Sequence, residues 1–318
     1  MGKVALVGAA GAIGKSIAAT LRAEGRPYRV IGRSHAALLQ AFGQDPLAEI
    51  ATWDPADPAS VRRALDGTDA AVHLVGVPYD KFEQHPIVMG QVLEGAVAAG
   101  VERLLQIGTV YPFGFARTPK VAPDHPREPH TFRGRMRKAQ EDLTLAAHAG
   151  GRIRTTILRL PDFYGPAGEA SFLHGTFTAA LAGKRAMMIG PIDRPHEFVF
   201  TPDVGPVASR LLSTPDAFGQ TWNLAGAGVI TQRAFAHKVF AAVGRPPKLL
   251  ALGKPILRLA GLFDPLMRGV ADMNYLVTDP VLLDDSALET LIGPMAKTSY
   301  DEGIAQTLAA LRQAGLPV

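Results

Sequence analysis

The feature that most constrains the fold is a glycine-rich turn close to the start of the chain. The apolar run Lys3–Val7 leads into Gly8-Ala-Ala-Gly11-Ala-Ile-Gly14, and helical character follows. In such a strand–turn–helix unit the first glycine permits a tight turn, the second lets the backbone approach a phosphate, and the third lets strand and helix pack closely. The free N–H groups of the helix start favour an anion. We therefore predict a dinucleotide-binding turn, with an unliganded glycine turn as the alternative. The predicted contacts are Gly8, Ala10, Gly11, Ala12 and Ile13.

Short apolar runs alternate with helical segments through the first half of the chain. The predicted strands are Lys3–Val7, Tyr28–Gly32, Glu49–Trp53, Ala70–Val75, Arg103–Gly108 and Ile153–Arg159. The predicted helices lie near 14–25, 35–43, 58–66, 84–99 and 134–149. Nearly continuous apolar strands, each followed by a helix, are typical of a parallel sheet covered on both faces. The predicted fold class is α/β, with a Rossmann-type doubly wound parallel sheet.

After Pro166 the pattern becomes irregular. We predict helices near 171–183, 202–212, 231–243, 253–263, 285–292 and 301–313, and short strands at Glu197–Phe200 and Thr221–Ala225. Glycine and proline separate these segments. The second half therefore indicates a smaller, mostly helical lobe folded against the carboxyl edge of the sheet.

The end of the second predicted strand bears on the choice of dinucleotide. An acid there would accept hydrogen bonds from a ribose 2′-hydroxyl, whereas an arginine would pair with a 2′-phosphate. Arg33 and Ser34 follow this strand, and the next acid is Asp45. We therefore favour NADP, with NAD as the alternative cofactor and a solvated Arg33 as the alternative role. The next two strand ends add Asp54, Leu74, Val75 and Gly76 to the expected adenosine site.

Later motifs carry a resemblance to a known family. They are Ile107-Gly108-Thr109, Leu158-Arg-Leu160-Pro161-Asp162-Phe163-Tyr-Gly-Pro166, His196-Glu-Phe-Val-Phe200-Thr-Pro-Asp203 and Trp222-Asn-Leu-Ala-Gly226. Together with the glycine turn they resemble the extended short-chain dehydrogenase/reductase family, also called the NAD-dependent epimerase/dehydratase family. The resemblance implies a Rossmann domain at 1–165 and 196–228 and a substrate lobe at 166–195 and 229–318. It also places Gly108, Leu160, Pro161 and Phe163 at the cofactor.

The resemblance implies a catalytic Ser/Thr and a Tyr-x-x-x-Lys pair on the fifth helix. The tyrosine moves the substrate proton, and the lysine lowers the pKa of that tyrosine and holds the ribose. Thr109 matches the first member, but the helix has no tyrosine. One register places Arg133 and Arg137 at the two positions, and the other places Gly134 and Lys138 there. Arg137 can hold a ribose, but an arginine cannot act as a general acid near neutral pH.

A replacement proton donor is needed if the chain is catalytic. Tyr111 follows Thr109 by two residues, and strand alternation would place both side chains on one side. We favour Tyr111, with packing under the lobe as its alternative, and we keep Asp162 and His130 as further candidates. Phe172, His174 and Tyr275 are candidate substrate contacts for which packing is an equal explanation. Packing is also the expected role of Met187, Met188, Met267 and Met273.

The segment from Arg117 to Lys138 carries seven Lys or Arg and two acids, a charge of +5, although the whole chain is only +4. A solvated loop and helix is one explanation. The other is an electropositive rim that attracts a cofactor phosphate or an anionic substrate. Phe132 is the only aromatic residue of the segment, so we expect no nucleic-acid partner.

Composition excludes several classes of protein. The chain has no cysteine, which excludes disulfides and thiolate sites, and its nine histidines show no metal-ligand spacing, so we expect no metal. No stretch approaches the ~20 apolar residues of a membrane span, and the apolar start fits a strand better than a leader peptide. We expect a cytoplasmic protein with a small-molecule substrate and no membrane partner.

Two functions stay open from the sequence. The favoured one is an NAD(P)-dependent oxidoreductase that acts on a carbonyl, alcohol or sugar-like compound with a non-standard proton donor. The alternative is a catalytically silent NADP-binding regulatory protein. The resemblance also implies a homodimer through helices 84–99 and 134–149, where Val92, Leu93, Ala96 and Val97 have helical apolar spacing.

Overall fold

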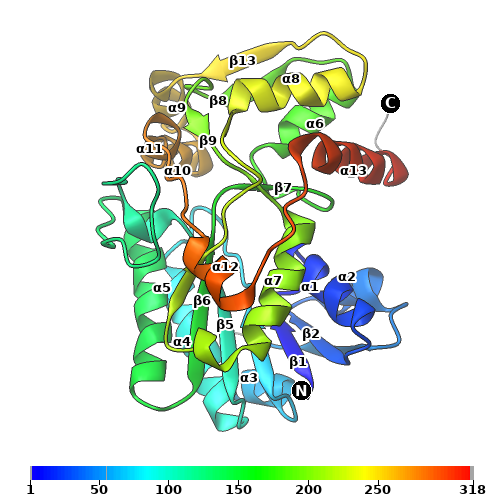
Figure 1. Ribbon diagram of the computed structural model, residues 1–318, viewed down its shortest axis with the longest axis vertical. Helices are drawn as coiled ribbons and strands as arrows, with labels where there is room; N and C mark the ends of the chain where they lie inside the picture. Colours follow the sequence, from blue (N-terminus) through cyan, green and yellow to red (C-terminus); the bar gives the residue numbers. More distant parts are fainter. Residues whose placement is uncertain (1, 55, 316–318) are drawn as a thin grey trace.

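A seven-stranded parallel sheet forms the centre of one half of the molecule (Figure 1). The computed structural model describes residues 2–54 and 56–315. The strand order is β11-β6-β5-β4-β1-β2-β3, so the order reverses between β1 and β4. The strands are β1 (Val4–Val7), β2 (Tyr28–Gly32), β3 (Ala48–Thr52), β4 (Ala70–His73), β5 (Arg103–Thr109), β6 (Arg154–Leu160) and β11 (Thr221–Asn223). The predicted doubly wound α/β class is confirmed.

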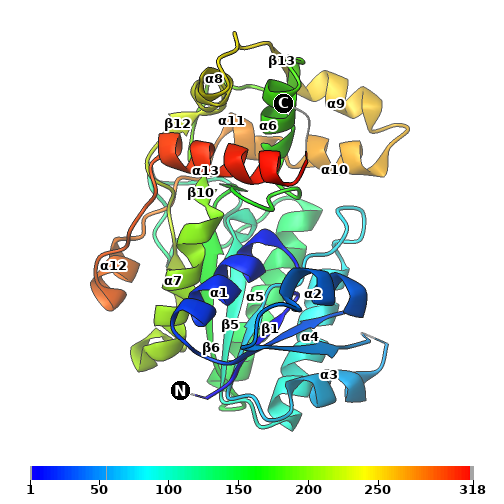
Figure 2. The ribbon, with the colours of Figure 1, turned by 90° about the vertical axis from the view of Figure 1, so that its right-hand side faces the viewer.

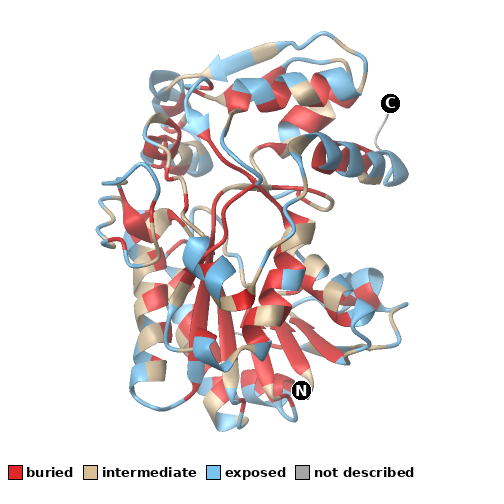
Figure 3. Cartoon of the chain, viewed as in Figure 1, coloured by how far each residue is buried: buried red, intermediate tan, exposed pale blue. Residues whose placement is uncertain are grey.

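Helices cover both faces of this sheet. One face packs against α1 (Ala12–Ala23), α2 (His35–Phe42), α7 (Thr201–Ser213) and α12 (Ser286–Ile292). The other face packs against α3 (Pro58–Leu65), α4 (Gln84–Ala98) and α5 (Phe132–Ala149). Figure 3 shows that the strands between these layers are largely buried. The continuously apolar strands of the sequence follow from this two-sided burial.

The second half of the molecule is a smaller lobe above the carboxyl edge of the sheet (Figure 2). Its larger elements are α6 (His174–Leu181), β8 (Ala186–Ile189), α8 (Gln232–Ala242), β13 (Leu249–Leu252), α9 (Lys254–Ala260), α10 (Pro265–Asp272), α11 (Tyr275–Thr278) and α13 (Tyr300–Gln313). Its short strands are β7 (Phe163–Tyr164), β9 (Pro195–His196), β10 (Val199–Phe200) and β12 (Ile230–Thr231), whereas the short turns η1 (Tyr111–Phe113) and η2 (Pro215–Ala217) pack against α5 and α7 of the sheet half. The lobe has its own aromatic core, built around Tyr164, Phe177, Phe198 and Phe235.

Several predicted boundaries in the lobe were wrong. The strand predicted at Glu197–Phe200 is two separate pairs, because β9 pairs with β12 and β10 pairs with β7. The helix predicted at 253–263 ends at Ala260, and a second helix, α10, begins at Pro265. The ribbon of β8 and β13 joins segments some sixty residues apart, with Ala186 beside Leu249. Such short, non-local pairings leave no periodic signal in the sequence.

The apolar residues that we assigned to a subunit interface are buried inside the chain. Val92, Leu93 and Ala96 are at most 3% exposed and pack in the core between the sheet and α3, α4 and α5. That assignment was therefore wrong, and the homodimer itself stays a prediction. Among residues 2–54 and 56–315, no helix combines the length and apolar character needed to cross a membrane.

Candidate functional site

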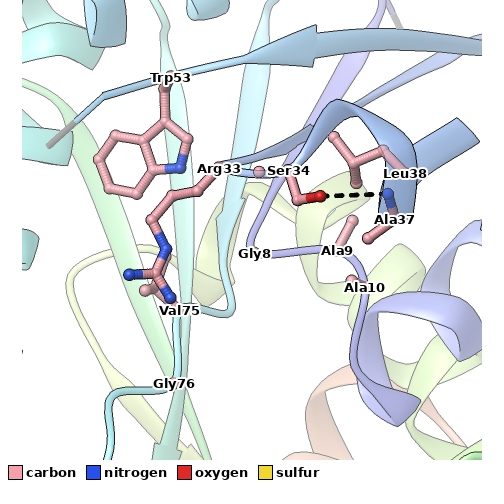
Figure 4. A pocket seen from close by; sticks show the side chains of 11 residues that line it. Gly8, Ala9, Ala10, Arg33, Ser34, Ala37, Leu38, Trp53, Val75 and Gly76 are labelled. Atoms are coloured by element: carbon pink, nitrogen blue, oxygen red, sulfur yellow. Dashed lines mark hydrogen bonds between the residues drawn. The ribbon is translucent and has the colours of Figure 1, made fainter.

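A cavity of about 520 Å³ opens at the carboxyl ends of β1, β2 and β4 (Figure 4). It lies where the strand order reverses, which is the usual ligand position in open parallel sheets. Its lining is Gly8, Ala9, Ala10, Gly32, Arg33, Ser34, Ala37, Leu38, Trp53, Val75 and Gly76. We call it the β1–β4 cavity.

The three glycines of the turn have different roles. Gly8 has φ +89°, and a Cβ there would lie 2.9 Å from the backbone of Leu74 and Val75. A Cβ at Gly14 would lie 2.2 Å from the carbonyl oxygen of Ala9. A Cβ at Gly11, which caps α1 without a side-chain hydrogen bond, would meet no atom within 4 Å. Gly8 and Gly14 are therefore required by the fold, whereas Gly11 leaves open space before the first N–H groups of α1.

Arg33 and Trp53 lie together on one wall of this cavity. Figure 4 shows the Arg33 side chain beside the Trp53 indole, with the guanidinium directed toward Val75. Arg33 has no ion-pair partner within the part of the chain that the structure describes. Its neighbour Ser34 caps α2 by accepting a hydrogen bond from Ala37 N–H (3.3 Å). The cavity therefore presents one uncompensated positive side chain.

Other predicted cofactor residues lie beside this cavity without lining it. Asp54 is exposed and accepts a hydrogen bond from Ala56 N–H (2.9 Å), and Trp53 lines the cavity in its place. Sequence reasoning missed Trp53, although its position at the end of a predicted strand was a usable signal. Ala12 and Ile13 begin α1, and Leu74 contacts the sheet core. Gly108, Leu160 and Pro161 are buried at the ends of β5 and β6.

Arg137 of α5 faces the end of β5. Its Nε donates to Thr109 Oγ1 (3.4 Å), and its Nη1 donates to Gln140 Oε1 (2.7 Å). Lys138 instead pairs with Asp142 at the surface (2.7 Å). Of the two registers that the sequence left open, the one with Arg133 and Arg137 therefore places Arg137 against Thr109.

The groups that contact Arg137 are buried and uncharged, and the carboxylate of Glu141, one helical turn away, acts on it at longer range. Its Nη1 also lies 3.1 Å from Nδ1 of His85, and Gln140 Nε2 lies 3.0 Å from Nε2 of His73. Burial, and then the charge of Arg137, lower the pKa of His73 to about 3 and that of His85 to about 2. Both histidines are therefore neutral, and no carboxylate contacts Arg137 within the described chain.

Arg133, one turn earlier on α5, occupies the position where the family tyrosine was sought. Its guanidinium donates to the Tyr79 carbonyl (2.8 and 3.1 Å) and lies 4.5 Å from the centre of the Tyr79 ring. Its Nη1 reaches Asp272 of α10 at 3.5 Å. Arg133 thus connects α5 to the lobe.

A second cavity, of about 540 Å³, lies between the sheet edge and the lobe. Tyr79, Tyr111 and Asp162 line its inner end, together with Phe163 and Phe172. The four methionines that we expected only to pack, Met187, Met188, Met267 and Met273, also line it. We call it the lobe cavity.

Tyr111 lines this cavity from a different element than the sequence predicted. β5 ends at Thr109, and Tyr111 lies in the turn η1, so strand alternation was the wrong reason. The Tyr111 N–H donates to Thr109 Oγ1 (3.4 Å), and its phenol hydrogen-bonds Tyr79. Burial, then the proximity of Tyr79 and Asp162, raise the pKa of Tyr111 well above its ordinary value. Tyr111 is therefore a neutral phenol that holds its proton until an acceptor takes it.

The remaining candidates lie elsewhere. His130 stacks on Phe115 (4.3 Å between ring centres) and packs against the buried Tyr275 (4.5 Å), and neither residue lines either cavity. His174 begins α6 outside both linings. Asp162 lies at the lobe cavity, where its Oδ2 is 3.0 Å from His196 Nε2.

Most of the basic segment is neutralised locally. Arg117 pairs with Glu128, and Arg127 pairs with Asp142 (2.8 Å) and Glu141 (3.2 Å). Arg133 and Arg137 are buried at the site, as described above. The segment therefore presents no continuous electropositive rim. The described residues also contain no group of three or more metal-ligating side chains.

Comparison with known proteins places this geometry in context. The model of the NAD dependent epimerase/dehydratase family matches residues 4–225. The chain is 28% identical over 190 residues to a dTDP-6-deoxy-L-talose 4-dehydrogenase (NAD(P)(+)) of Kitasatospora kifunensis, a match covering 58% of this chain and 59% of that protein. It is 32% identical over 164 residues to a uronate dehydrogenase of Pseudomonas putida, covering 50% and 60%. The chain thus spans about three fifths of the length of these curated relatives.

Solved structures share the fold over nearly the whole chain. A UDP-glucuronic acid 4-epimerase from Bacillus cereus in complex with NAD has a TM-score of 0.81 at 18% identity, covering 98% of this chain and 99% of that one. The dTDP-glucose 4,6-dehydratase DesIV from Streptomyces venezuelae has a TM-score of 0.82 at 20% identity, covering 98% and 97%.

Proposed function

The chain belongs to the NAD-dependent epimerase/dehydratase family, and on that premise we propose that it is an NADP-dependent oxidoreductase of a carbonyl or alcohol compound. The observation that carries the proposal is that Tyr111 lines the inner end of the lobe cavity, with Thr109 hydrogen-bonded to it and Arg137 hydrogen-bonded to Thr109 behind the lining. The three residues come together where β5 ends, at the carboxyl edge of the sheet. A hydroxyl, a neutral phenol and an uncompensated guanidinium are what a hydride-transfer site needs around the reacting oxygen.

Each part of the site has a separate role in this proposal. The cofactor supplies the hydride when bound. The open space at Gly11 would admit its pyrophosphate to the start of α1, and Arg33 would pair with its 2′-phosphate. Arg137 would donate hydrogen bonds to the nicotinamide ribose. Thr109 Oγ1 orients the substrate oxygen, and Tyr111 gives that oxygen a proton as the carbonyl is reduced.

NADP is the cofactor that the charge of the cavity favours. Arg33 is unpaired, and no acidic side chain lines the cavity to accept a ribose 2′-hydroxyl. Binding of NAD in place of NADP is the alternative. A competition experiment that measures the affinity of the protein for each dinucleotide distinguishes the two cofactors.

The proton donor is tested by removing one phenol at a time. Tyr111→Phe is expected to cut turnover by ~10²–10⁴-fold, as for the loss of a general acid, with NADP affinity retained. Arg137→Ala should weaken NADP binding and turnover together. Tyr79→Phe is the matched control, because it deletes the neighbouring phenol and leaves that of Tyr111 in place; its loss should be much smaller.

A regulatory protein that binds NADP without catalysis is the second candidate, because α5 carries no tyrosine. It requires tight NADP binding with no hydride transfer at any pH across a panel of carbonyl compounds. Turnover that is unchanged in Tyr111→Phe would remove Tyr111 from the mechanism and leave Asp162 as the carboxyl group that lines the same end of the cavity.

A further inference from the structure

The composition of the lobe cavity points to the class of substrate. We propose that it takes an apolar carbonyl compound, in which a hydrocarbon chain or ring ends in a single reducible oxygen. The inference rests on the proposed function for where the oxygen lies, at Tyr111, and it adds what occupies the rest of the cavity.

The lining is apolar along most of its length. Fourteen of its nineteen residues are apolar, so a polyhydroxylated ligand would find few hydrogen-bond partners beyond the inner end. The polar side chains away from that end each already donate a hydrogen bond within the chain. Ser171 Oγ donates to the Phe163 carbonyl (2.5 Å), and Asn274 Nδ2 donates to the Gly190 carbonyl (2.9 Å). Hydroxyl groups of a bound sugar would therefore lie unpaired in this region.

The charge of the cavity also argues against a nucleotide sugar or a uronate. No Lys or Arg is among the lining residues, and the charged side chain that lines the cavity is Asp162. The nearby Arg133 guanidinium is held by the Tyr79 carbonyl and Asp272. A diphosphate or a carboxylate would thus meet a carboxylate without a compensating cation.

The walls are adaptable, and one of them comes from a part of the chain outside the family match. Four methionines line the cavity, and their unbranched side chains adjust to ligands of varied shape. Leu257, Met267 and Leu276 come from α9, α10 and α11, which lie beyond the matched residues 4–225. The sugar substrates in the names of the relatives therefore do not indicate what this wall of the cavity binds.

The α9–α10 hairpin also forms the mouth of the cavity. Leu266 is half exposed and at the same time part of the lining, whereas Leu262 on the connecting turn is 68% exposed and outside the lining. The hairpin thus has an inner and an outer apolar residue that can be changed separately.

The test measures binding of linear methyl ketones (heptanone, nonanone and undecanone) to the protein loaded with oxidised NADP, by titration calorimetry. Affinity should rise with chain length, by up to about fourfold per methylene. Met267→Glu places a charge on the inner wall and should abolish this dependence. Leu262→Glu, the matched control on the outer side of the hairpin, should keep it. NADP affinity is measured in all three proteins to show that the cofactor site is intact.

The outcomes separate this inference from the proposed function. Ketone affinity that is independent of chain length, or equal in Met267→Glu and wild type, overturns the inference, as does tighter binding of UDP-glucose or galacturonate than of undecanone. Chain-length-dependent binding without oxidation of NADPH supports the inference and overturns the proposed function. Reduction of a sugar with no ketone binding supports the proposed function and overturns the inference.

Discussion

Two buried charge clusters lie one helical turn apart on α5 and are neutralised differently. Behind β6, Arg159 and Glu141 are each 1% exposed and form two hydrogen bonds, of 2.9 and 2.8 Å. On the cavity side, Arg137 hydrogen-bonds Thr109, Gln140 and a neutral histidine, and no carboxylate contacts it within the described residues. The comparison teaches that a buried charge paired with an opposite charge stabilises the fold. A buried charge without such a partner is available to bind a ligand.

The largest expected effect comes from breaking the matched cluster. Arg159→Met leaves the Glu141 carboxylate buried and should lower the free energy of unfolding by about 3–5 kcal/mol. Arg137→Met breaks no direct ion pair but leaves Gln140 Oε1 without this donor, so its loss should be smaller, about 1–3 kcal/mol. Denaturant titration of both variants measures the difference, and equal losses would contradict the comparison.

A buried acid without an opposite charge beside it should make the free energy of unfolding depend on pH. Glu197 accepts hydrogen bonds from the backbone N–H groups of Leu283 and Gly226, and burial raises its pKa to about 7 from 4.5. Between pH 4.5 and about pH 7, Glu197 therefore keeps its proton in the folded chain but has lost it in the unfolded chain. The contribution is fully present below pH 4.5 and is lost as the pH rises through about 7.

The measurement compares wild type with Glu197→Gln. The stability of wild type relative to the variant should fall by about 2–3 kcal/mol between about pH 5 and pH 8. His73 and His85 titrate in the opposite sense, because their pKa values are lowered, but they are present in both proteins and cancel. A constant difference across this range would place Glu197 among the matched charges.

Arg33 extends the comparison to the β1–β4 cavity. If its unpaired guanidinium serves the 2′-phosphate, Arg33→Ala should weaken NADP binding by about 1.5–3 kcal/mol. NAD binding and the unfolding transition should stay nearly unchanged. Calorimetry that finds equal losses for NADP and NAD would show that Arg33 does not read the phosphate.

The smallest expected effects on stability come from substituting two glycines of the same turn, Gly14 and Gly11, and the two substitutions should differ. Gly14→Ala forces a Cβ against the Ala9 carbonyl and should lower stability by about 1–3 kcal/mol. Gly11→Ala meets open space, so it should leave stability unchanged and weaken the dinucleotide alone. Thermal unfolding and cofactor titration of the pair check this, and similar stability losses would mean that Gly11 also serves the fold.

Sequence reasoning was most successful where structure is local. Residues such as Val4–Val7 and Tyr28–Gly32 form strands because a two-sided sheet needs unbroken apolar runs, and the glycine turn follows from spacing alone. It was least successful in the lobe, where Met187 of β8 and Met267 of α10 reach the same cavity across eighty residues. Tyr111, which the sequence favoured as the proton donor, lines the lobe cavity from a turn and not from the strand, and its catalytic role stays a prediction.

The sequence by itself therefore determined the class of sheet and the turn at Gly8–Gly14, because both follow from periodicity and spacing along the chain. The family resemblance added the identity of the helix that faces Thr109. The tertiary structure alone decided which arginine of that helix lacks a carboxylate, why Val92 and Leu93 are core residues and not an interface, and that the lobe cavity is apolar. Those properties depend on which distant side chains share one enclosed space. Spacing along the chain carries no information about that.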